Sequence, residues 1–454
     1  MREYNFDGLV GPTHNYAGLS RGNLAASRHE GRPANPREAA LQGLAKMRFI
    51  FELGVGQAVL PPQPRPSLAT LRALGFSGSD EQVISRAARE DEHLIRLCSS
   101  AASMWAANAC TCAPSEDTAD GRLQITPANL QQMFHRAIEA ETTYQVLSRI
   151  FADAKRFAVH RPLPGGGQFA DEGAANHSRL STPGHAAVHL FAWGRSTYRE
   201  GIGPRLFPAR QTFEASTALA RLHQLNPDRC VLAQQSPEGI DAGAFHTDVL
   251  AVGNEGFWMM HERAFADPQA VLGSLRERLG PALRVAVARE SELKLEEAVS
   301  AYPFNSQVVT LPGGAMAILA PVESEHSEPA RRFLERVLAE DNPVTAVHFL
   351  DVRQSMKNGG GPACLRQRIW LTGEEVAAVR ANVFFSPALH DALESWIRRH
   401  YRDRLVPGDL ADPALARESM AALDELTRIL QIGSVYDFQR VSSGEPPWPS
   451  TRRR

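Results

Sequence analysis

The segment at residues 307–321, QVVTLPGGAMAILAP, predicts two β-strands joined by a tight Pro-Gly-Gly turn. A second segment, HTDVLAVGNEGFWMMH at residues 246–261, predicts another such pair that turns at residues 254–256. Strands joined by so short a turn run antiparallel. Because helical patterns lie on both sides of these hairpins, the two segments indicate a mixed sheet in an α/β fold.

Helical patterns alternate with short β-rich runs along the rest of the chain. Asn35 is a good helix cap, Ser79 and Gln82 form a capping-box pattern, and Thr126 before Pro127 predicts a further helix start. Helices are predicted at 35–54, 212–225, 327–340, 386–401 and 412–430, and strands at 230–233, 247–252, 307–311, 315–319, 344–352 and 366–371.

No GxGxxG or GxxxxGK[ST] motif follows a predicted strand, and this disfavours a doubly wound nucleotide-binding fold. At 454 residues the chain is long enough for three average domains. No low-complexity linker divides it, so we expect one large domain over residues 1–441. The last stretch, SSGEPPWPSTRRR at 442–454, has the composition of a loose tail.

Composition excludes several classes of partner. The 49 basic and 51 acidic residues leave a formal charge of −2, so we expect no nucleic-acid partner. No apolar run approaches the length of a membrane span, and Arg2, Glu3 and Asp7 occupy the place of a signal peptide's apolar stretch. We therefore expect no membrane association and no signal peptide.

Five cysteines, few and odd in number, favour a reducing compartment, so a cytoplasmic protein is expected. Cys110 and Cys112 form a CxC pair that has no second ligand pair beside it. Both are expected to be buried thiols. The sequence calls for no metal and no organic cofactor.

The least ordinary local sequence is NGGGPACLR at 358–366, where a glycine-rich loop leads into Cys364 just before a predicted strand. A thiol at the end of such a loop can face a cleft as a nucleophile, although a tight turn with a buried cysteine fits equally well. His246 and Asp248 lie two apart at the start of a predicted strand, which predicts that both side chains share one sheet face. A histidine near a strand is more often structural.

The third candidate cluster is QFADEGAANHSRL at 168–180, which contains Asp171 and Glu172. Such an acidic pair can be a solvated loop, or it can present carboxylates to a planar cation. Thiol, imidazole and carboxylate together suggest chemistry on an amidine, and they are also the parts of a cysteine amidase.

The chain resembles the N-succinylarginine dihydrolase family. The matching motifs are FDGLVGPTHNYAGLSRGN (6–23), GFSGSDEQV (75–83), FHRAIE (134–139), DEGAANH (171–177), FPARQT (207–212), FHTDV (245–249), NGGGPACLR (358–366) and GSVYDFQR (433–440). The resemblance implies the pentein fold, an α/β propeller of five modules with pseudo-fivefold symmetry and a central site. One loop per module would then carry Asp7, Asn108, Glu172, His246 and Cys364.

By the same resemblance, Cys364 is expected to be the nucleophile, His246 the general acid and base, and Glu172 the third catalytic residue. Asp248 is expected to grip the substrate's guanidinium, with Arg136 and Arg210 at its carboxylates. The expected substrate contacts are Ala17, Gly18, Leu19, Ser20, Arg21, Gly22, Asn23, Leu24, Ala25, Ala26, Asn108, His135, Arg136, Arg210, Asp248 and Asn358. The family usually has Ser where this chain has Ala26.

The activity implied by the resemblance is hydrolysis of N2-succinyl-L-arginine to N2-succinyl-L-ornithine, two ammonia molecules and carbon dioxide, in a homodimeric enzyme of arginine catabolism. Two alternatives stay open at this point. One is a guanidine deiminase that stops after one ammonia and acts on arginine or another amidine. The other is a catalytically silent guanidine-binding protein on the same fold.

Overall fold

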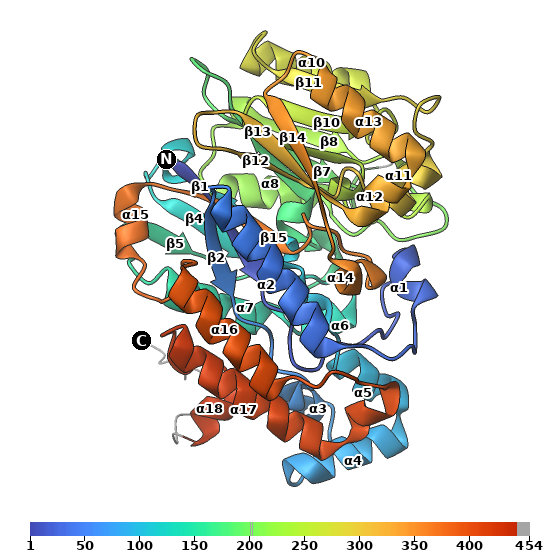
Figure 1. Ribbon diagram of the computed structural model, residues 1–454, viewed down its shortest axis with the longest axis vertical. Coiled ribbons are helices and arrows are strands. Elements are labelled where there is room, and N and C mark those ends of the chain that lie inside the picture. Colours follow the sequence, from blue (N-terminus) through green and yellow to red (C-terminus); the bar gives the residue numbers. More distant parts are fainter. Residues whose placement is uncertain (200, 202, 443–454) are drawn as a thin grey trace.

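The computed structural model describes residues 1–199, 201 and 203–442, and within them it contains five three-stranded sheets built on one plan (Figure 1). In each sheet the middle strand pairs antiparallel with one neighbour and parallel with the other. In the order antiparallel, middle and parallel strand, the sheets are β15 (Arg366–Leu371), β1 (Arg2–Gly8) and β2 (Gly56–Leu60); β3 (Cys110–Ala113), β4 (Leu123–Pro127) and β5 (Phe157–Val159); β6 (His177–Leu180), β7 (Val188–Trp193) and β8 (Cys230–Gln234); β9 (Ala251–Asn254), β10 (Phe257–His261) and β11 (Arg284–Ala288); β12 (Gln307–Thr310), β13 (Met316–Pro321) and β14 (Val344–Leu350).

A helix carries the chain from the middle strand to its parallel partner in every one of these sheets, as a parallel pair requires. These crossover helices are α2 (Pro36–Glu52), α7 (Ala140–Ile150), α8 (Phe213–Leu222), α10 (Pro268–Leu279) and α13 (Glu328–Ala339). The mixed α/β fold is thereby confirmed. The propeller arrangement of the modules and the domain boundaries at 1–441 and 442–454 stay predictions, and residues 443–454 of the expected tail lie outside the described part of the chain.

Shorter helices and turns connect the modules. The helices are α1 (Leu24–Arg28), α6 (Phe134–Ala137), α9 (Pro237–Asp241), α11 (Leu295–Ala301), α12 (Val322–His326), α14 (Arg353–Lys357) and α15 (Gly373–Ala378), and the 3-10 turns that bear on the site are η2 (Ala106–Asn108), η5 (Gly173–Asn176) and η7 (Thr247–Val249). Further helices occupy the lower part of Figure 1, and α16 among them packs beside α2; they are α3 (Leu68–Ala73), α4 (Asp80–Glu90), α5 (Glu92–Cys98), α16 (Pro387–His400), α17 (Pro413–Ile429) and α18 (Asp437–Ser442).

Local capping explains where several helices begin. The Asn35 side chain accepts a hydrogen bond from the Glu38 backbone N–H at the start of α2. Ser79 and Gln82 make the predicted capping box at the start of α4. The predicted hairpins are also confirmed, as β9–β10 and β12–β13.

Two local predictions are wrong. Thr126 and Pro127 do not begin a helix but end strand β4, because Thr126 pairs with Thr111 and Pro127 with Cys110 across the sheet. The segment predicted as one strand at 247–252 begins with the turn η7, and strand β9 starts only at Ala251. His246 therefore precedes this turn and Asp248 lies within it, so the two side chains do not share a strand face.

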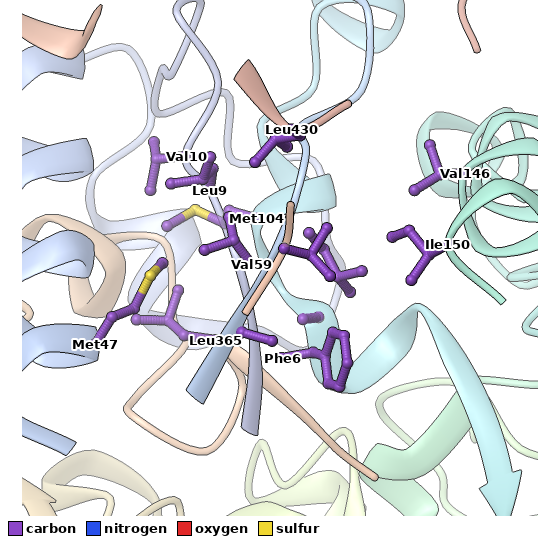
Figure 2. Close-up of a cluster of buried hydrophobic side chains, with 14 of the residues drawn as sticks. Phe6, Leu9, Val10, Met47, Val59, Met104, Val146, Ile150, Leu365 and Leu430 are labelled. Atoms are coloured by element: carbon purple, nitrogen blue, oxygen red, sulfur yellow. The ribbon is translucent and has the colours of Figure 1, made fainter. Parts of the chain in front are cut away.

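The largest hydrophobic core joins the first sheet to the helices beside it. Phe6 and Val59 from β1 and β2 meet Met47 of α2, Ile150 of α7 and Leu365, which directly precedes β15 (Figure 2). These side chains come from both ends of the chain. Their burial fixes the segment that carries Cys364 against the N-terminal strand.

Candidate active site

Five loops lead into the antiparallel strands of the five sheets, and each is hydrogen-bonded to the next. The bonds are Ala107 N to Cys364 O (3.1 Å), Asn108 Nδ2 to Glu172 O (2.6 Å), Thr247 N to Asn176 Oδ1 (3.0 Å), Asn305 Nδ2 to Asp248 O (3.3 Å) and Ala363 N to Asn305 O (3.1 Å). The loops thus form a closed ring. The three predicted catalytic residues all lie on it and are all buried.

Glu172 is the centre of a buried charged cluster. Its Oε2 lies 2.7 Å from His246 Nε2 and also accepts a hydrogen bond from Arg136 Nη1. Burial alone would raise the pKa of Glu172, but Arg136, His246 and Arg210 outweigh burial and hold that pKa below its ordinary value. Glu172 is therefore a carboxylate at neutral pH, and it can fix the orientation of the His246 ring.

Burial lowers the pKa of His246 to about 4, against the opposing effect of Glu172. The ring is consequently neutral at pH 7. Its Nδ1 has no hydrogen-bond partner among the described residues. A neutral imidazole with one nitrogen fixed by a carboxylate and the other open can accept a proton from a reacting group.

Cys364 and Asp248 form a second contact in the ring. Cys364 Sγ lies 3.7 Å from Asp248 Oδ2. Burial, and then the charge of Asp248, raise the pKa of the Cys364 thiol well above its usual value. Burial also raises the pKa of Asp248 to about 7. The free chain therefore holds the thiol protonated, and a cation placed beside both groups would favour thiolate and carboxylate together.

The site contains unpartnered polar atoms of two kinds, acceptors and donors. Within the described part of the chain, Glu172 Oε1 and Asp248 Oδ1 are buried acceptors without a hydrogen-bond partner, whereas Arg136 Nε and Nη2 and Arg210 Nε are buried donors without one. Arg210 is held by the backbone O of Arg21 at 3.2 Å and lies over the Phe245 ring. Buried groups of this kind are costly unless a ligand pairs with them.

The predicted substrate loop, residues 17–26, closes one side of the site. Asn23 Oδ1 caps helix α1 by accepting from the Ala26 N–H at 3.0 Å, while its Nδ2 donates to Asn358 O at 2.9 Å. Ser20 Oγ lies 3.2 Å from His135 Nε2. A small cavity beside this loop is lined by Ala17, Ser20, Ala26, Trp105, His135 and Asn358, among others.

Ala26 itself presents only a methyl group to that cavity, and the hydroxyl of the neighbouring Ser27 bonds back to Asn23 O at 3.2 Å. The serine hydroxyl usual in the family is thus not replaced by its neighbour.

One predicted member of the ring is wrong. Asp7 lies within the middle strand β1, where Lys46 and Gln57 bind its carboxylate, and not in a loop that leads into a sheet. The fifth loop contributes Asn305, which the sequence reasoning missed. Its signal is positional, because Asn305 stands two residues before β12 just as Cys364 stands two residues before β15.

Several buried histidines predict sensitivity to acid. Burial is the largest cause that lowers the pKa of His14, His135 and His223 to about 3. It also lowers the pKa of His246, to about 4. Since each folded pKa lies below the unfolded value of about 6.5, the unfolded chain binds more protons as the pH falls, and each histidine costs about 1.4 kcal/mol per pH unit. We expect unfolding between about pH 6 and 4, measured by circular dichroism.

The variant His14→Phe provides the matched control, because both ring nitrogens of His14 lack partners. The unfolding free energy of this variant should fall less steeply as the pH decreases, by about 1.4 kcal/mol per pH unit, because one proton fewer is taken up on unfolding. An unchanged slope in this variant would show that His14 does not contribute.

Comparisons with known proteins bear on this site. The model of the family described as succinylarginine dihydrolase matches residues 1–439. The N-succinylarginine dihydrolase of Myxococcus xanthus (strain DK1622) is 70% identical over 440 residues, which cover 97% of this chain and 100% of that protein. The enzyme of the same name from Chromohalobacter salexigens is 53% identical over 445 residues, covering 97% and 99%.

Among solved structures, the N-terminal domain of ArgZ, an arginine dihydrolase from the ornithine–ammonia cycle in cyanobacteria, is similar with a TM-score of 0.50 at 14% identity, covering 82% of this chain and 98% of that one. Unliganded AgrE gives a TM-score of 0.50 at 14% identity over 82% of this chain and 41% of its own. At such identity the likeness shows the fold alone, which is the pentein fold. No described helix is long and apolar enough to cross a membrane.

Proposed function

The chain belongs to the succinylarginine dihydrolase family, and we propose that it converts N2-succinyl-L-arginine and two waters to N2-succinyl-L-ornithine, two ammonia molecules and carbon dioxide. The observation that carries this proposal is that the site has both unpartnered acceptors and unpartnered donors. Acceptors of Glu172 and Asp248 suit a guanidinium, and donors of Arg136 and Arg210 suit carboxylates. The substrate has both kinds of group, at opposite ends.

The first half-reaction uses the thiol. With the guanidinium held by Glu172 and Asp248, its positive charge favours the Cys364 thiolate, and the thiol proton becomes available to His246. The thiolate attacks the guanidinium carbon and forms a C–S bond. His246 then gives its proton to the leaving nitrogen, so the C–N bond breaks and ammonia departs.

Water then hydrolyses the covalent intermediate and completes the first of the two hydrolysis reactions. His246 accepts a proton from water as the oxygen bonds to the same carbon, and the C–S bond breaks to restore the thiolate and leave a ureido group. A second attack by Cys364 on the ureido carbon releases the second ammonia. Hydrolysis of the resulting thiocarbamate gives a carbamate, which loses carbon dioxide and frees the ornithine amine.

The experiment that tests this function is incubation with N2-succinyl-L-arginine, with ammonia and N2-succinyl-L-ornithine measured together. We expect two ammonia molecules for each substrate consumed. One ammonia with an accumulating ureido product would identify a deiminase, and turnover of free arginine alone would exclude the succinyl group as a determinant. Binding without any ammonia would identify a silent guanidine-binding protein.

Arg210 provides a prediction about the carboxylate end. The Arg210→Ala variant should raise KM by about 10- to 100-fold, because one charge-assisted hydrogen-bonding group is lost, and should change kcat only a few-fold. Steady-state kinetics measure both constants. Arg210→Lys retains the charge but lacks the planar guanidinium, so its KM should lie between those of the native chain and Arg210→Ala. An unchanged KM for Arg210→Ala would show that Arg210 does not contact the substrate.

We further propose that the protein is cytoplasmic and forms a homodimer. All five cysteines are free, which fits a reducing cytoplasm. The family resemblance supports a homodimer, and light scattering of the purified chain tests it.

A further inference from the structure

Asn305 occupies the fifth loop of the ring and has no role in the proposed chemistry so far. It stands two residues before β12, in the same relation to its sheet as Asn108 to β3 and Cys364 to β15. Its side chain is fully buried. Burying an amide is unfavourable unless its hydrogen-bonding atoms find partners, so the partners of Asn305 indicate what the residue is for.

Those partners lie on two different loops. Asn305 Oδ1 accepts from the Gly361 N–H at 2.9 Å, and its backbone O accepts from the Ala363 N–H at 3.1 Å. On the other side, Asn305 Nδ2 donates to the backbone O of Asp248 at 3.3 Å. One residue therefore ties the loop that carries the thiol to the loop that carries Asp248.

Gly361 shows how close this approach is. A Cβ atom at Gly361 would lie 2.8 Å from Asn305 Oδ1 and 2.9 Å from its backbone O, closer than any side chain allows. The glycine-rich sequence before Cys364 is thus matched to Asn305, and Asn305 sets the position of that loop.

We propose that Asn305 is a positioning residue that holds the loop of the Cys364 thiol in register with the loop of Asp248. This inference rests on the proposed nucleophilic role of Cys364. It concerns a residue that does not itself react. Asn305 lies on a third loop, and it makes hydrogen bonds to both the loop that carries Cys364 and the loop that carries Asp248.

The charges around the thiol support an amide at this place. Burial and Asp248 raise the pKa of Cys364, whereas the neutral Asn305 side chain acts in the opposite direction and lowers it. Arg210 and Tyr302 also interact electrostatically with the thiol. A carboxylate in place of the amide would lose the Nδ2 donor and add a negative charge beside the thiolate.

Two variants test the proposal. Asn305→Asp keeps the shape and removes the donor, and Asn305→Ser keeps a hydroxyl in case the aspartate variant does not fold. Asn254→Ser is the matched control, since Asn254 is also buried and donates to Glu3 and Thr310 away from the thiol. Circular dichroism and thermal melting establish that each variant is folded.

The readouts are the kcat and KM for N2-succinyl-L-arginine and the pH dependence of Cys364 alkylation by iodoacetamide, followed by peptide mass spectrometry. We expect Asn305→Asp to lower kcat by about 100-fold or more with KM within about threefold, as for the loss of a preorganised donor. The midpoint of alkylation should move up by at least about one pH unit. Asn305→Ser should show smaller changes in the same direction, and Asn254→Ser none.

A fall in kcat with an unchanged alkylation midpoint, or equal effects in the Asn254 control, would overturn the proposal and leave Asn305 a structural residue. An unchanged kcat would overturn it as well. If the native chain does not turn over N2-succinyl-L-arginine, the proposed function fails, and the alkylation profile still decides whether Asn305 acts on the thiol.

Discussion

The Cys364→Ser variant should lose at least about 10⁴-fold in kcat for N2-succinyl-L-arginine and keep its melting temperature within a few degrees. A serine hydroxyl is a far weaker nucleophile than a thiolate, because it stays protonated at neutral pH. Stability should be retained because serine is smaller than cysteine and fits the same buried space.

Ammonia release measures the loss of turnover, and acid-quenched mass spectrometry of the native chain should show a covalent adduct on the Cys364 peptide. Cys230→Ser is the matched control, because that thiol lies in strand β8 outside the ring of loops. Normal ammonia release by Cys364→Ser would remove Cys364 as the nucleophile.

The Glu172→Gln variant should affect both activity and stability. It leaves Arg136 as a buried cation without its partner, a change that costs about 3–5 kcal/mol of unfolding free energy. It also removes the carboxylate that orients His246, for which a loss of about 10³- to 10⁴-fold in kcat is expected by analogy with other carboxylate–histidine pairs. Denaturant unfolding and steady-state kinetics measure the two effects separately.

A double variant, Glu172→Gln with Arg136→Met, separates the two causes. Removing both charges should restore most of the lost unfolding free energy, because replacing a buried ion pair by neutral groups is often nearly neutral. Activity should not return. Recovery of kcat in the double variant would contradict the orienting role of Glu172.

The parts of the fold that are determined by residues close together in the sequence could be predicted from the sequence. The capping box at Ser79 and the strand at 366–371 are set by hydrogen bonds or patterns within a few residues, and both are confirmed. Thr126 and Pro127 carry a helix-start pattern, yet pairing with a strand that lies before them in the chain decides their structure. The local sequence around Thr126 carries no information about that pairing partner.

The candidate site, like the fold, could be predicted only in part from the sequence. Cys364, His246 and Glu172 were found from their motifs and the resemblance, and they lie together on the ring. The predicted shared strand face of His246 and Asp248 is wrong because the chain turns before entering its sheet. Arg136 was expected only at the substrate's carboxylates, but it also pairs with Glu172. Such contacts between distant loops leave no spacing pattern in the sequence.

The pairing of β15 with β1 has a consequence for biosynthesis. Arg2 of β1 pairs with Leu371 of β15, and β1 leaves the ribosome well before β15 is made. Until then β1 has an exposed edge on that side, and such edges invite aggregation. Contacts between residues so far apart in sequence also form slowly. Because the proposed nucleophile Cys364 lies two residues before β15, we expect a nascent chain to become active only after β1 and β15 have paired.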